Sequence, residues 1–269
     1  MSVIWHKVWR DLIHNKARTA LVVLSIAVGV FALGLVFGAR GVIDVHLARE
    51  REASQAANVT FKGDQIGRQT VEAALREPGV TDAEIETVAP IRWRLPQETG
   101  WQQGVLVARE DYGTQRVSLV ELLEGSWPGE GANPQGGLAL AVERQTSRHY
   151  AVPLGTSIVV ETGRGELASI GGVVRKPYVM PPFFGEPATF YATPETIARL
   201  TGAQDPNKLY VRLTPGGERT DEVRKRVEDR LERMGLSVSG SVVAGTEDEI
   251  LADLLDDQLN AVFLVLGAV

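Results

Sequence analysis

Few residues in this sequence have the types and spacing that chemistry requires, and the densest group is acidic. Six carboxylates fall close together near the end of the chain: Glu247, Asp248, Glu249, Asp253, Asp256 and Asp257. Carboxylates bind Ca²⁺, but these lack the alternating spacing and central glycine of a calcium-binding loop. We interpret them as the solvated face of a charged helix.

Histidine and cysteine, the usual metal ligands and nucleophiles, offer no site either. The four histidines lie far apart: His6, His14, His46 and His149. The chain has no cysteine, which excludes disulfides, thiolate nucleophiles and cysteine-based metal sites. It also lacks the phosphate-binding loop G-x-x-x-x-G-K-[ST], the G-x-S-x-G elbow and the H-E-x-x-H pair. We expect a non-catalytic chain without cofactor that does not hydrolyse ATP by itself.

The composition is that of a folded chain. Of 269 residues, 44% are hydrophobic and 23% are charged, so a core can form. The net charge of −6 argues against a nucleic-acid partner, because phosphate binding needs a basic surface.

One long apolar run dominates the beginning of the chain. Residues 19–39 contain no charge and, as a helix, would be about 31 Å long, enough for the hydrocarbon core of a bilayer. We predict a transmembrane helix here; a buried core helix and a cleaved signal peptide are the alternatives. Small residues at Ser25, Gly29, Gly34 and Gly38 would let another helix approach closely.

The flanks of this run predict its orientation. Residues 1–18 carry four Lys or Arg against one Asp, whereas three Arg follow the run among three acids. By the positive-inside rule the N-terminus is cytoplasmic and the bulk of the chain lies outside. Residues 1–18 also place Trp and aliphatic residues at helical spacing, which is typical of an amphipathic helix at the lipid surface.

The other end of the chain is apolar as well. Residues 258–269 carry no charge and directly follow the acidic stretch. We predict the truncated start of a second transmembrane helix; the alternative is a short apolar end that packs back on the domain.

Between the two apolar segments, residues 40–257 predict an α+β extracytoplasmic domain of mixed α/β type. Residues 40–57 lack proline and contain good helix formers, so the first helix continues as a stalk that ends near Asn58. We expect Arg49 and Arg51 on this stalk to meet Asp253 and Asp256 where both segments enter the membrane.

Beyond the stalk, the periodicity alternates between strand and helix. The expected strands are Asn58–Phe61, Ile85–Arg92, Gly104–Ala108, Ser157–Glu161, Ala168–Val174, Lys208–Leu213 and Ser237–Val243. The expected helices are Thr70–Arg76, Ala141–Ala151, Pro194–Leu200 and Thr220–Met234. The last strand–helix–strand unit is expected to pair with the strand at Asn58–Phe61, and residues of about 115–204 to form an inserted β-rich lobe.

Several motifs follow one another along the chain. Residues 15–29, NKARTALVVLSIAVG, form a basic, Arg-Thr-containing entry to the first apolar run. Further motifs are LEGSWP at 123–128, VPLGT at 152–156, FYATPE at 190–195 and the strand Leu209–Leu213. In this order they resemble the permeases of MacB/FtsX-type ABC transporters, and the resemblance covers the first membrane helix and the MacB-like periplasmic core domain.

The resemblance implies a function and partners. It implies a permease subunit of the bacterial cytoplasmic membrane that forms a homodimer or heterodimer and couples ATP hydrolysis by a partner ATPase to motion of its outer domain. Membrane lipid and a periplasmic or extracellular protein are further implied partners. The alternative is a single-span membrane-anchored sensor or adaptor whose outer domain binds a ligand or protein.

Overall fold

The computed structural model of the chain describes residues 20–21, 23–31, 49–130, 137–177, 182, 185–217 and 219–242, with the backbone alone at 241 and 242. The chain divides into two compact units, Met1–Glu50 and Arg51–Val269. Expectations for residues 1–18, 32–48 and 243–269 lie outside the described residues.

The first unit is described over part of the predicted membrane helix. Residues 20–21 and 23–31 are helical, and the seven large apolar side chains among them are 59–69% exposed. Among the helices that the structure describes, none is both long enough and apolar enough to cross a membrane.

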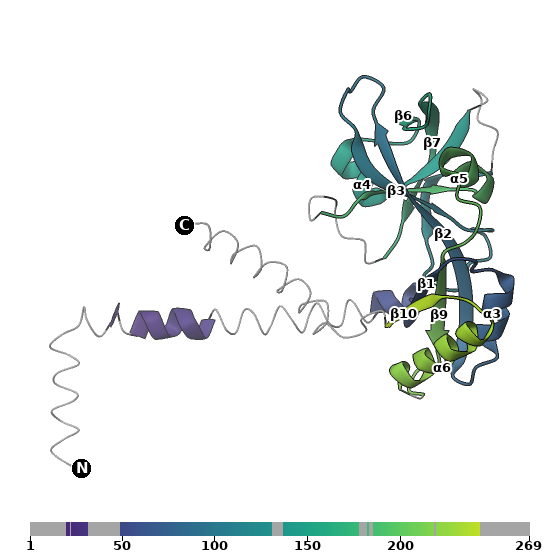
Figure 1. Ribbon diagram of the computed structural model, residues 1–269. Helices are drawn as coiled ribbons and strands as arrows, with labels where there is room; N and C mark the ends of the chain where they lie inside the picture. Colours follow the sequence, from purple (N-terminus) through teal and green to yellow (C-terminus); the bar gives the residue numbers. More distant parts are fainter. Residues whose placement is uncertain are drawn as a thin grey trace, which may run out of the picture. The chain divides into compact units, whose positions relative to one another are not determined.

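The second unit alternates strands and helices, as expected for a mixed α/β domain (Figure 1). In chain order its elements are β1 (Val59–Gly63), α3 (Arg68–Leu75), β2 (Val80–Arg94), β3 (Gln102–Ala108), β4 (Glu121–Gly125), β5 (Leu138–Glu143), α4 (Arg144–Tyr150), β6 (Ser157–Val160), β7 (Glu166–Arg175), β8 (Ala188–Ala192), α5 (Pro194–Thr201), β9 (Lys208–Leu213), α6 (Thr220–Arg233) and β10 (Val238–Val242).

The first sheet has the order β10-β1-β9-β2, and every neighbouring pair in it is antiparallel. Helices α3 and α6 cover one face, because the buried stripe Val223, Val227 and Leu231 of α6 packs with Phe61 and Leu209 of the sheet. The predicted pairing is confirmed: β1 lies between β9 and β10, the two strands that α6 connects.

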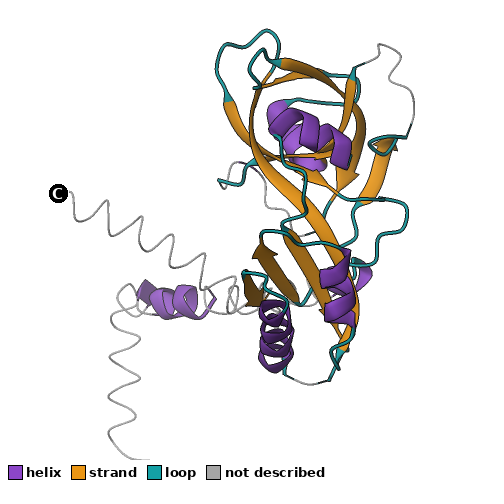
Figure 2. Cartoon of the chain, turned by 45° about the vertical axis from the view of Figure 1, so that its right-hand side comes forward, coloured by secondary structure: helices purple, strands orange, loops and turns teal. Residues whose placement is uncertain are grey.

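The second sheet contains β3, β8, β5, β7, β4 and β6 and curls around its own core (Figure 2). Trp93 lies in this core, with its ring 5.1 Å from those of both Tyr150 and Phe190 in edge-to-face contact. Ile197 and Leu200 of α5 pack on the same cluster. The expected lobe at 115–204 contributes most of these strands, and β3 joins them from before residue 115.

Strand β2 belongs to both sheets. Residues from Val80 to Glu86 pair with β9, and residues from Thr87 to Trp93 pair with β3. The change of partner between Glu86 and Thr87 is therefore the point where the two sheets meet.

One expected element is partly wrong. The helix expected from Ala141 begins only at Arg144, because Leu138–Glu143 forms the central strand β5 between β7 and β8. Glu143 ends the strand and caps the helix, since its carboxylate accepts from the backbone N–H groups of Gln145 and Thr146. Alternating Leu, Ala and Val at 138–142 fit either period, and burial on both faces favours the strand.

Candidate functional site

The candidate site is built around Arg109, which follows β3 at the junction of the two sheets. Its side chain is 1% exposed. Arg109 Nε donates to Glu86 Oε1 at 3.0 Å, and Nη1 lies 3.3 Å from Glu84 Oε1. Nη1 and Nη2 also donate to the carbonyls of Val117 and Ser118 at 3.0 and 3.1 Å. One guanidinium thus joins two carboxylates of β2 to a loop.

Glu86 is the more deeply buried of the two carboxylates, at 1% exposure. Its second oxygen accepts from the hydroxyl of Tyr210 on β9 at 2.7 Å. Burial alone would raise the pKa of Glu86, but the charges of Lys176 and Arg109 and these hydrogen bonds lower it to about 2. Burial lowers the pKa of Arg109, whereas Glu86 and Glu84 raise it, with a net rise. Both groups are therefore charged at neutral pH.

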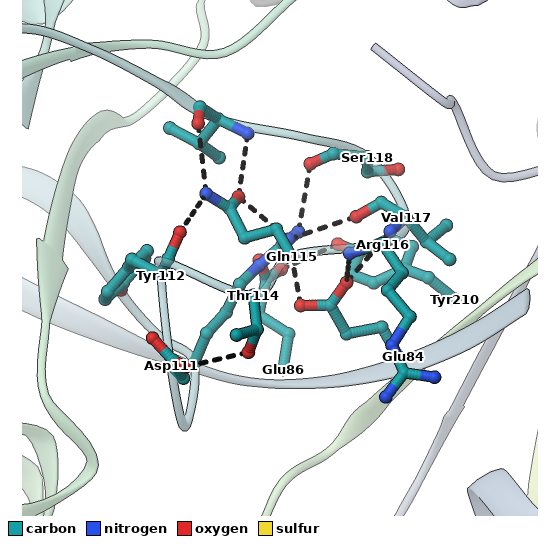
Figure 3. A network of polar contacts seen from close by, with 12 residues as sticks. Glu84, Glu86, Asp111, Tyr112, Thr114, Gln115, Arg116, Val117, Ser118 and Tyr210 are labelled. Carbon is teal, nitrogen blue, oxygen red and sulfur yellow. Dashed lines mark hydrogen bonds and ion pairs between the residues drawn. The ribbon is translucent and has the colours of Figure 1, made fainter.

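Glu84 and Gln115 hold the loop that Arg109 contacts (Figure 3). Glu84 Oε2 accepts from the N–H groups of Arg116 and Val117, each at 2.9 Å. Gln115 Oε1 accepts from Arg109 Nη1 at 3.2 Å and from the N–H of Val120 at 2.8 Å, and its Nε2 donates to two loop carbonyls. We name residues 110–120 the junction loop, and Glu84, Glu86, Arg109, Gln115 and Tyr210 the junction network.

The junction loop also holds the end of the stalk. The N–H groups of Ser118 and Leu119 donate to the carbonyls of Gln55 and Ser54 at 2.9 and 2.8 Å. In return, the N–H of Ala57 donates to Ser118 Oγ at 3.2 Å. The residues that leave the stalk are thus linked through Ser118 and Arg109 to the carboxylates of β2.

The junction network links β2, β9 and the junction loop through direct hydrogen bonds. Each oxygen of Glu84 and Glu86 is occupied by a donor of the protein, so neither carboxylate is available as a base. Among the described residues, no three His, Asp or Glu side chains are placed to hold a metal ion. A buried, fully paired network fixes geometry, because moving either partner leaves a charge unpaired in the interior.

The residues predicted from sequence are not brought together within the described parts. Ser25 Oγ donates to the carbonyl of Leu21 at 2.6 Å, and Gly29 has open space where a side chain would be. Arg49 and Arg51 are helical, and Arg51 Nη2 donates to the carbonyl of Ala57 at 3.4 Å. The remaining predicted residues lie outside the described ones, so the predicted contacts stay predictions: Gly34, Gly38, Asp253 and Asp256.

The junction network was missed by sequence reasoning. The signal was present, since Glu84 and Glu86 alternate with Ala83 and Ile85 in a strand. Because the strand was expected to begin at Ile85, Glu84 was not assigned to it.

A family model described as the MacB-like periplasmic core domain matches residues 19–230. The chain belongs to this family. The match spans the junction network, the stalk and most of both sheets. MacB-like periplasmic core domains are parts of ABC-type transporter permeases with extracytoplasmic domains, so the resemblance to MacB/FtsX-type permeases is confirmed. No curated protein matches the chain.

Three solved structures are similar to the chain. The periplasmic region of MacB from Actinobacillus actinomycetemcomitans is 9% identical, with a TM-score of 0.42, over 70% of this chain and 90% of that chain. The extracellular domain of the noncanonic ABC-type transporter YknZ from Gram-positive bacteria is 11% identical, with a TM-score of 0.44, over 70% and 99%. A domain of a putative permease protein from Porphyromonas gingivalis is 17% identical, with a TM-score of 0.42, over 74% and 96%.

Proposed function

We propose that this MacB-like domain is the moving outer part of an ABC transporter permease, and that it transmits work from a partner ATPase. The observation that carries the proposal is the junction loop. Ser118 is bonded to the end of the stalk through its N–H and Oγ and to the buried Arg109 through its carbonyl. A displacement of the stalk is therefore passed to β2 through short, saturated contacts.

Strand β2 is the element that would receive this displacement. It pairs with β9 in the first sheet and with β3 in the second, and Glu84 and Glu86 lie just before the change of partner. A shift of Glu84 and Glu86 relative to Arg109 would change the angle between the two sheets, because the junction network contains residues of both sheets. Two packed sheets that share one strand offer a hinge at the shared strand.

The membrane arrangement that we propose is the one predicted from the apolar segments and their flanking charges. Residues 1–18 lie on the cytoplasmic side, residues 19–39 cross the bacterial cytoplasmic membrane, and residues 258–269 begin a second span. The exposed apolar side chains of residues 20–31 support a helix that faces lipid or other membrane helices. The proposed partners are an ABC-type ATPase on the cytoplasmic side and a second permease copy or a related permease.

The test is to purify the native gene product from its own membrane by an affinity tag and to measure its intact mass and its co-purifying proteins. A mass above that of the 269-residue chain, with further apolar spans and a bound ABC-type ATPase, supports the permease. A product of 269 residues without an ATPase contradicts it and favours the single-span sensor or adaptor.

A further inference from the structure

Three lysines gather beside the junction network. Six of the 28 basic residues are lysine, and four of these lie in the described outer domain: Lys62, Lys176, Lys208 and Lys225. Lys62 of β1 is directly opposite Lys208 of β9, which in turn is opposite Glu86 of β2. Lys176 follows β7 of the second sheet, and its Nζ lies 5.8 Å from the ring centre of Tyr210. Residues from both sheets thus meet here.

Lys62 and Lys208 lie on the face of the first sheet that α3 and α6 do not cover. Their neighbours Phe61 and Leu209 are fully buried in the core under α3 and α6. Because side chains alternate along a strand, Lys62 and Lys208 point to the opposite face. This is also the face on which Tyr210 and Glu86 meet Arg109.

The positive charge of this cluster is balanced only in part, by the charge of Glu86 near Lys176 and Lys208. Among the described residues, no carboxylate lies within ion-pair distance of Lys62, Lys176 or Lys208. The carboxylate closest in register, Glu86, already accepts from Arg109 and Tyr210. Like charges directly opposite on paired strands are destabilising.

The charged form of Lys208 is also disfavoured by burial. Burial lowers the pKa of Lys208, and the charges of Lys176 and Lys62 lower it further, against the opposing effect of Glu86. A polar group in the same region lacks a partner: the buried hydroxyl of Tyr191 has no hydrogen-bond partner among the described residues. Burial raises the pKa of Tyr191, as does the charge of Glu86.

We propose that Lys62, Lys176 and Lys208 form a binding site for an oxyanion, a carboxylate or phosphate group, that bridges the two sheets. An anion there removes the repulsion between the opposed ammonium groups. Lysine suits this role because its ammonium is a compact charge with three rotatable donors, whereas most cations elsewhere in this chain are arginines. A bound anion would link Lys176 of the second sheet to Lys62 and Lys208 of the first.

The first experiment measures thermal unfolding of the full chain in detergent, with sodium phosphate or sodium acetate titrated against sodium chloride at equal ionic strength. We expect the melting temperature to rise with phosphate or acetate and not with chloride. The Lys208→Gln variant should need at least tenfold more anion for the same rise, whereas Lys225→Gln on α6 should respond like the wild type. The stronger of the two anions identifies the class of ligand.

The second experiment needs no variant, so it stands even where a substitution prevents folding. The chain is acetylated by an activated ester, and the rate at each lysine is followed by mass spectrometry. Phosphate or acetate should slow acetylation of Lys62, Lys176 and Lys208 several-fold and leave Lys225 unchanged. Equal protection of all four lysines, or equal effects of chloride, would overturn the site. Neither experiment involves an ATPase, so the result is independent of the proposed function.

Discussion

At the scale of single residues, the junction network is defined by how completely its charges are paired. Burying one arginine with two glutamates costs several kcal/mol per ion unless hydrogen bonds replace the lost water. Here Arg109 has two carboxylates and three further oxygen acceptors, and Glu86 has a donor on each oxygen. Such a network couples its members tightly, because a shift of Arg109 must be followed by Glu84, Glu86 and the junction loop.

Removal of Arg109 should therefore be among the most destabilising single changes in the domain. Arg109→Ala leaves Glu84 and Glu86 buried without their cation, and we expect a loss of about 3–5 kcal/mol in the free energy of unfolding. The control is Arg68→Ala, because Arg68 pairs with Glu110 at side-chain exposures of 78% and 65%. Exposed pairs contribute roughly 0–1 kcal/mol. Denaturant unfolding followed by circular dichroism checks both variants, and equal losses would refute the assigned role.

The carboxylate of Glu86 predicts a specific dependence on pH. Its pKa is about 2 in the folded chain, against 4.5 for an unperturbed glutamate, so the folded state favours the charged form. The resulting stability is complete above pH 4.5 and is lost as the pH falls towards 2. The shift corresponds to roughly 3 kcal/mol. The stability difference between wild type and Glu86→Gln should thus shrink as the pH falls through this window.

The matched control for this experiment is Glu98→Gln, in an exposed turn after β2. This variant replaces an exposed carboxylate outside the junction network. A constant difference between wild type and Glu86→Gln over this pH range would mean that Glu86 is not held in its charged form by Lys176, Arg109 and Tyr210.

At the scale of elements, the junction loop is the link between stalk and sheets, and Gln115 gives it its shape. The amide of Gln115 makes contacts with Tyr112, Val120 and Arg109. Gln115→Ala should loosen the loop while both sheets stay folded. In the full chain, hydrogen–deuterium exchange at the amides of residues 116–120 should rise at least tenfold, with β9 unchanged. Gln103→Ala, at an exposed position of β3, is the control, and unchanged exchange in the loop would argue against the link.

Several elements were predicted with bounds close to those found. Lys208–Leu213 is found with the predicted bounds, although residues of both its faces are buried. Helix α6 ends one residue early, and its buried residues Val223, Val227 and Leu231 follow a single clear period. Strands β4, β5 and β8 were not predicted. Strands β5 and β8 lie inside the second sheet with buried residues at most positions, and such runs show no alternation. Strand β4 is at the edge of the sheet and is exposed at four of its five positions, so it shows no apolar pattern.

The contacts within the junction network could not be predicted for a different reason, although the alternation of Glu84 and Glu86 in β2 is visible in the sequence. Arg109 and Glu86 lie 23 residues apart, and Tyr210 lies 124 residues from Glu86. Only the pairing of β2 with both β3 and β9 brings them together, and a single sequence does not fix that register. The lysine cluster could not be predicted for the same reason, because Lys176 comes from the second sheet and Lys62 and Lys208 come from the first.

At the scale of the whole molecule, we expect charge pairing between the stalk and the acidic segment before the second span to contribute to the proposed function. Reversing Arg49 and Arg51 to Glu should place like charges against Asp253 and Asp256, where we predict contacts. In the full-length protein with its ATPase, we expect ATP hydrolysis to continue while transport per ATP falls several-fold, because the stalk no longer moves with the second span.

The decisive control for this prediction is the double reversal. Adding Asp253→Arg and Asp256→Arg should restore transport per ATP, since opposite charges again face each other. Arg51 also donates to the carbonyl of Ala57, so Arg49→Glu is tested alone to separate pairing at the membrane from the local turn. Unchanged transport after the first reversal, or no rescue by the second, would mean that the stalk transmits motion through the junction loop without these charges.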